Sequence, residues 1–101
     1  MRMMIFFDLP MTTSAEKRSY RIFRKEIQQL GFVMLQESVY VKLALTPTVA
    51  DSLRLKLHQI KPPRGLVQVL IVTEKQYAAM ETIVGEWKSS VIDSHERFVV
   101  L

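Results

Sequence analysis

The chain has 101 residues, of which 49% are hydrophobic and 24% are charged, and this favours one folded domain over a chain that is disordered throughout. It has no cysteine, which excludes disulfides, thiolate metal sites and thiol catalysis and fits a reducing cytoplasm. The net charge of +4 suggests a polyanionic partner, and no stretch has the roughly 18 apolar residues that a membrane-spanning helix needs. We therefore expect a cytoplasmic protein without membrane contact.

The first third of the chain predicts a strand followed by a helix. Residues 3–7 form a continuous apolar run, typical of a central strand that is buried on both faces, and Asp8 closes it. Thr13, with Glu16 three residues later, predicts a capping box at the start of the helix. Gly31 predicts its end. The apolar face of this helix carries Tyr20, Phe23, Ile27 and Leu30.

The middle of the chain predicts three more strands and a second helix. Residues 32–35 and 39–45 form a hairpin pattern around residues 36–38. Thr46, followed by a proline, predicts the start of the second helix. Its predicted inner face carries Val49, Leu53, Leu57 and Ile60. Residues 66–72 are rich in β-branched side chains and predict the fourth strand.

This order of elements predicts an α+β, ferredoxin-like βαββαβ fold, in which a four-stranded antiparallel sheet carries both helices on one face. We assign residues 1–73 to this core and residues 74–101 to a C-terminal extension within the same single domain. The extension starts with a predicted short helix that ends near Ala79. Residues 82–84 are compatible with a short strand, and residues 96–101 predict a final apolar strand.

The final strand needs a partner, because the core sheet is complete without it and one face of that sheet stays uncovered. We expect the strand to complete the sheet of a second copy, which gives a two-fold homodimer with exchanged tails. The alternative is a tail that folds back onto its own sheet.

Asp8 is the first candidate for chemistry, because a carboxylate directly after a buried strand is costly unless something compensates its charge. It is either a turn residue or a ligand for a hard cation. A single carboxylate makes a weak metal site, whereas two copies of Asp8 facing each other across a dimer axis would make a better one. The residues alone favour the turn.

The second candidate is a run of cations on the first helix, at a spacing that puts them on one arc away from the apolar face. This basic face consists of Lys17, Arg18, Arg21, Arg24 and Lys25. Many such faces are simply solvated, but only Glu16 and Glu26 dilute this one, whereas a merely soluble helix tends to mix both signs. Arginine suits phosphate contacts, so we favour phosphate binding.

Six segments together resemble the Cas2 family of small CRISPR-associated proteins, and most of all its members from Cas9-type systems. The segments are Phe6-Phe7-Asp8-Leu9-Pro10, residues 17–25, Gly31-Phe32, residues 36–40, residues 73–77 and residues 84–86. No single segment is specific, but their order and spacing are.

The resemblance implies a ferredoxin-like homodimer in which Asp8 is the catalytic, metal-binding carboxylate at the interface, with Mg²⁺ as its ion. Ser38 and Tyr40 match a Ser-Val-aromatic element of the family and are candidate neighbours of that site. Glu37 departs from the family pattern, because many members have a basic residue near this turn. That departure bears on nuclease activity more than on the fold.

The resemblance implies two activities. Family members form the central, non-catalytic dimer between subunits of the larger CRISPR integrase, where a basic surface holds duplex DNA during spacer acquisition. Members are also described as metal-dependent endonucleases on RNA or DNA. We predict the first role and leave the second open. The alternatives are a stand-alone, toxin-like endoribonuclease and a small-molecule regulatory module of the same fold.

Overall fold

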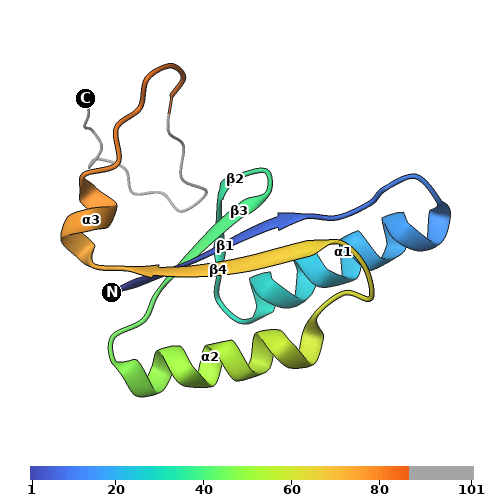
Figure 1. Cartoon of the computed structure of the whole chain (residues 1–101), viewed down its shortest axis with the longest axis horizontal. Coiled ribbons are helices and arrows are strands. Elements are labelled where there is room, and N and C mark those ends of the chain that lie inside the picture. The colour runs from blue at the N-terminus through green and yellow to red at the C-terminus, as the bar shows by residue number, and fades with distance from the viewer. Residues whose placement is uncertain (87–101) are drawn as a thin grey trace.

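The computed structural model describes residues 1–86. Its elements are β1 (Arg2–Asp8), α1 (Ser14–Gln29), β2 (Val33–Gln36), β3 (Val39–Leu43), α2 (Pro47–Ile60), β4 (Leu66–Val72) and α3 (Glu74–Ala78). The strands form one antiparallel sheet in the order β2-β3-β1-β4, and α1 and α2 lie on the same side of it (Figure 1). This is the predicted ferredoxin-like arrangement, with β1 at a central position.

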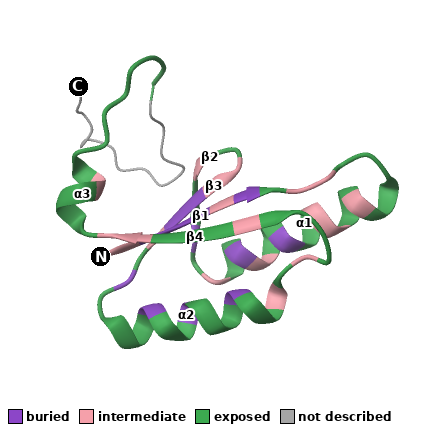
Figure 2. Ribbon diagram, in the orientation of Figure 1, coloured by how far each residue is buried: buried purple, intermediate pink, exposed green. Residues whose placement is uncertain are grey.

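The core lies between the sheet and the two helices, and Phe7 is at its centre. The Phe7 ring lies 5.3 Å from the Phe23 ring of α1 and 5.7 Å from the Tyr40 ring of β3, measured between centroids. Buried side chains gather on β1 and on the helix turns that face the sheet, whereas β4 is largely exposed (Figure 2). The buried cluster consists of Met3, Ile5, Phe7, Phe23, Ile27, Phe32, Tyr40, Ala44, Ala50, Leu53 and Leu57.

Local signals fix both ends of α1, as the sequence predicts. The Thr13 hydroxyl accepts a hydrogen bond from the Glu16 amide at 3.1 Å, and the Glu16 carboxylate accepts one from the Thr13 amide at 3.0 Å. At the other end, Gly31 has φ +100° and the Phe32 amide donates to the Ile27 carbonyl at 3.1 Å. This second bond ties Phe32 to the end of the helix, so β2 starts one residue later than predicted.

The second helix is rotated relative to its predicted inner face. Leu53 and Leu57 are buried as expected, but Val49 is 40% exposed and Ala50 takes the inward position with 1% exposure. In an α-helix, residues four positions apart are offset by about 40° around the axis. A set of every fourth residue therefore runs from the centre of one face to its edge. The prediction for Val49 was therefore wrong.

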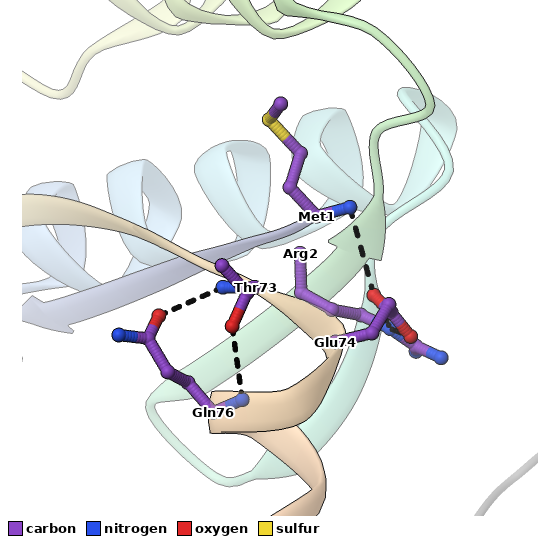
Figure 3. Close-up of polar contacts among 5 residues, drawn as sticks. All are labelled: Met1, Arg2, Thr73, Glu74 and Gln76. Atoms are coloured by element: carbon purple, nitrogen blue, oxygen red, sulfur yellow. Dashed lines mark hydrogen bonds and ion pairs between the residues drawn. The ribbon is translucent and has the colours of Figure 1, made fainter.

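The C-terminal extension begins as predicted with a short helix, α3, which has a capping box of its own. The Thr73 hydroxyl accepts from the Gln76 amide at 3.0 Å, and the Gln76 side chain accepts from the Thr73 amide at 2.8 Å (Figure 3). The Arg2 guanidinium donates to the Glu74 carboxylate at 2.9 Å and lies 4.6 Å from the centroid of the Tyr77 ring. These contacts attach α3 to the start of β1.

The short strand that residues 82–84 could form is absent. The chain bends there, and Ile83 and Val84 are 83% and 90% exposed, because no described strand lies alongside to pair with them. The predicted strand at residues 96–101 lies outside the described residues. Its exchange with a second copy, and the division of the chain at residue 73, stay predictions.

Candidate nucleic-acid interface and the Asp8 site

Asp8 is the last residue of β1 and lies on the face of the sheet that points away from the helices. Side chains alternate along a strand, and Met3, Ile5 and Phe7 face α1 and α2. Arg2, Met4, Phe6 and Asp8 therefore point to the opposite side. The helices α1 and α2 lie on the other side of the sheet. The helix α3 contacts this side at Arg2 through Glu74 and Tyr77, and Asp8, at the opposite end of β1, is exposed.

We call this side of the sheet the open face. Residues that pair directly across antiparallel strands share a face, so the register defines its members. They are Arg2, Met4, Phe6 and Asp8 of β1, Val33 of β2, Val39, Val41 and Leu43 of β3, and Leu66, Gln68, Leu70 and Val72 of β4. All but Arg2, Asp8 and Gln68 are apolar. Met4 and Val41 are buried, whereas Leu43, Leu66 and Leu70 are 42%, 54% and 52% exposed. Asp8 thus stands at one end of an apolar surface.

The backbone around Asp8 is held from two directions. The Phe7 amide donates a hydrogen bond to the Ser38 carbonyl in the β2–β3 turn at 3.1 Å. On the other side, Asp8 pairs with Leu66 at the start of β4. The next residue, Leu9, packs against the core. The strand end that carries the carboxylate is therefore anchored, while the carboxylate itself faces outward.

A single Asp8 would contribute one carboxylate to a magnesium site. Within the described part of the chain, no group of three or more His, Cys, Asp or Glu side chains could hold a metal ion. A lone exposed carboxylate still fits the chemistry of Mg²⁺, which often binds proteins through one or two carboxylates and keeps several waters. A second Asp8 from another copy would complete such a pair.

The two candidate neighbours of Asp8 lie differently. Ser38 contacts the end of β1 through its backbone carbonyl, which accepts the hydrogen bond from the amide of Phe7, the residue before Asp8. Tyr40 is fully buried, and its hydroxyl accepts a hydrogen bond from the Gln28 amide group at 3.5 Å. Burial raises the pKa of Tyr40, although the nearby Arg24 opposes that shift. Because Tyr40 belongs to the core cluster, it lies on the opposite side of the sheet from the Asp8 side chain.

The basic face of α1 is solvent-exposed, as its helical spacing predicts. Lys17, Arg18, Arg21, Arg24 and Lys25 are all exposed. Among residues 1–86 none of the five forms an ion pair, and the Arg24 guanidinium lies 5.7 Å from the centroid of the Tyr20 ring.

The carboxylate of Glu16 does little to neutralise this face. It accepts hydrogen bonds from the Thr12 and Thr13 amides, which lower the pKa of Glu16, and it lies 3.8 Å from Arg64. Its charge is therefore directed to the end of the helix and to the α2–β4 loop. The basic face keeps a net positive charge.

The two candidate surfaces lie on opposite sides of the molecule. The basic face is the outer side of α1, and the inner side of α1 packs on the covered face of the sheet. Asp8 lies on the open face. The structure therefore brings the five cations together and separates them from the carboxylate. Within residues 1–86 no helix is long and apolar enough to cross a bilayer.

The sequence model of the family described as CRISPR associated protein Cas2 matches residues 1–80. This chain belongs to the Cas2 family. A curated relative named CRISPR-associated endoribonuclease Cas2, from Treponema denticola, is 50% identical over 101 residues, which is all of both chains. A relative of the same name from Lacticaseibacillus rhamnosus is 44% identical over 101 residues, again all of both chains.

A solved structure supports the fold independently. The crystal structure of Streptococcus pyogenes Cas2 at pH 6.5 aligns with a TM-score of 0.61 and 19% sequence identity. The alignment covers 83% of this chain and 100% of that chain. The resemblance noted from six short segments is thus confirmed, and the protein is a CRISPR-associated protein with a ferredoxin-like fold.

Proposed function

We propose that this Cas2 protein acts in CRISPR spacer acquisition as a homodimer that binds duplex DNA through the basic face and bridges subunits of the larger integrase. The observation that carries the proposal is the basic face itself: five exposed cations on one helix, without ion-pair partners among residues 1–86. The integrase partner rests on the family alone.

A helix of this kind suits the phosphate backbone of a duplex. α1 has 16 residues and so is roughly 24 Å long, enough to pass several successive phosphates. Three of its five cations are arginines, which form bidentate, charge-assisted hydrogen bonds with phosphate. Such contacts give affinity and position the duplex, and they do not select its sequence.

The open face supports the homodimer. Exposed apolar side chains that gather on one face, here Leu43, Leu66 and Leu70, are a feature of interaction sites. Two copies stacked through their open faces would bury Leu66 and Leu70 and leave both basic faces on the outside. The edge strand β4 could then also accept the C-terminal strand of the partner.

The salt dependence of duplex binding tests this proposal. The measurement compares the wild type with Arg21→Ala/Arg24→Ala and with Lys56→Ala/Lys61→Ala, which removes the same charge from α2 and from the residue after it. Each phosphate contact steepens the slope of log affinity against log salt by about 0.9 for duplex DNA. We expect the α1 variant to lose about 1.8 of that slope and the control to lose little. Equal losses in both variants would contradict a specific role of α1.

An Asp8-dependent endonuclease activity is a second candidate. It is favoured by the exposure of Asp8 at the end of β1 and by the name of the curated relatives. Asp8 from each copy would hold Mg²⁺, which polarises a phosphate and lowers the pKa of a bound water. We expect cleavage of labelled RNA or DNA that needs Mg²⁺ and is lost in Asp8→Asn. Cleavage that survives EDTA would contradict this candidate.

The small-molecule module finds less support. A hollow of about 190 Å³ lies between the start of α1 and the α2–β4 loop. It is lined by Leu9, Pro10, Thr13, Ala15, Glu16, Ser19, Tyr20, Pro62, Pro63 and Arg64. Pockets for drug-sized ligands usually measure about 300–1,000 Å³, so this hollow is small for that purpose.

A further inference from the structure

We propose that Gly65 is a positioning residue for Asp8: the missing side chain lets the α2–β4 loop lie directly against the backbone that carries the carboxylate. The proposal rests on the role of Asp8 proposed above, because only a functional carboxylate needs an accurate position. It assigns a task to a residue that is 57 positions away in the sequence.

The contact is close and involves main-chain atoms. A Cβ atom at Gly65 would lie 2.9 Å from the Asp8 carbonyl oxygen and 3.1 Å from the Leu9 Cα atom. It would also lie 2.7 Å from Leu9 Cδ2. The side-chain atom could rotate away, but the two backbone atoms could move only with the strand end itself.

The strand end has little room to move. The Phe7 amide is bonded to the Ser38 carbonyl, and Leu9 packs against the core. A side chain at position 65 would therefore push Asp8 out of its pairing with Leu66 or force the loop away from it. The first movement displaces the Asp8 carboxylate directly. The second removes the loop from the strand end and shifts Leu66, which follows Gly65 and pairs with Asp8.

Gly31 provides a matched control. Its φ is +100° and that of Gly65 is +101°, so alanine would adopt an unfavourable left-handed φ at both positions. A Cβ at Gly31 would lie 2.6 Å from the Lys42 Nζ atom, the far end of a flexible side chain that can swing aside. Gly31→Ala thus carries the strain of Gly65→Ala without the contact to the Asp8 backbone.

The test uses the full-length protein as wild type, Asp8→Asn, Gly65→Ala and Gly31→Ala. The backbone NMR signals of Asp8 and Leu9 and the side-chain carboxyl signal of Asp8 are recorded without metal. The affinity for Mn²⁺, used as a probe for Mg²⁺, is measured by electron paramagnetic resonance. We expect similar losses of melting temperature in the two glycine variants. Only Gly65→Ala should shift the Asp8 and Leu9 signals and weaken Mn²⁺ binding at least tenfold.

Two results would overturn the proposal. The first is that the Asp8 and Leu9 signals of Gly65→Ala do not differ from those of the wild type. The second is that the two glycine variants bind Mn²⁺ equally well although Asp8→Asn no longer binds it. If the wild type and Asp8→Asn bind Mn²⁺ equally, the metal role of Asp8 is wrong, and the NMR signals alone decide the position of the strand end. Should Gly65→Ala not fold, Gly65→Asn replaces it, because asparagine enters the left-handed region more readily and brings the same Cβ.

Discussion

The two faces of the sheet differ in how much apolar side chain they leave exposed. On the side of α1 and α2, Met3 and Ile5 are 0% exposed and Phe7 is 5% exposed. On the open face, Met4 and Val41 of the central strands are also buried, but the β4 residues Leu66 and Leu70 remain 54% and 52% exposed. The helices α1 and α2 cover one face, and the other keeps an exposed apolar surface along β4. The covered face carries the stability of the subunit, and the open face is the surface that we assign to a second copy.

The largest effect on stability is expected from removing a buried side chain on the covered face. Phe7→Ala removes a ring that contacts Phe23 and Tyr40, and we expect it to lower the free energy of unfolding by about 3–5 kcal/mol. Urea unfolding measures this loss. Leu45→Ala is the control, because Leu45 is 77% exposed and its truncation should change stability by less than about 0.5 kcal/mol. Similar losses in both variants would contradict the description of the core.

The next effect concerns the open face. Leu70→Glu places a carboxylate where the proposed dimer would bury it, which is costly for an unpaired charge. We expect the dissociation constant of the dimer to rise at least a hundredfold, or about 2.8 kcal/mol, in analytical ultracentrifugation. Leu55→Glu is the matched control, since Leu55 is a 62% exposed leucine on α2. A Leu70→Glu protein that stays dimeric would rule out this face as the interface.

The smallest effect is expected at the link between α3 and β1. The hydrogen bonds from Arg2 lower the pKa of Glu74, so the ionised carboxylate stabilises the folded state above its ordinary pKa near 4.5. That contribution is lost as the pH falls through the lowered pKa. We expect Glu74→Gln to melt slightly below the wild type at pH 7 and level with it in acid. Glu81→Gln is the control, and a constant difference between wild type and Glu74→Gln at all pH values would contradict the assignment.

Local patterns were sufficient for most of the fold. The capping residues Thr13 and Thr46, the short helix that follows β4 and the bounds of β4 at residues 66–72 follow from short-range chemistry, and all are found as predicted. The exposure of the basic face follows in the same way from helical spacing. The order of the elements then restricts the topology to the observed sheet.

What the sequence could not give is the juxtaposition of distant residues. The side of the sheet that Tyr40 faces depends on the pairing register between β3 and β1. A shift of that register by one residue would move every side chain of the strand to the other face. The contact of Gly65 with the Asp8 backbone joins the α2–β4 loop to the end of β1, and no periodicity in the chain encodes it. The prolines at positions 62 and 63 indicate that the second helix ends there, but they do not indicate which strand end the segment lies against.

The separation of the two surfaces is the central claim, and duplex binding by two variants tests it most directly. Arg21→Ala/Arg24→Ala changes the basic face, and Asp8→Asn changes the open face. Affinity for duplex DNA is measured for both and for the wild type at one salt concentration. We predict that the arginine variant loses affinity at least tenfold while Asp8→Asn stays within twofold of the wild type. Loss of duplex affinity in Asp8→Asn, or its retention in the arginine variant, would contradict the account.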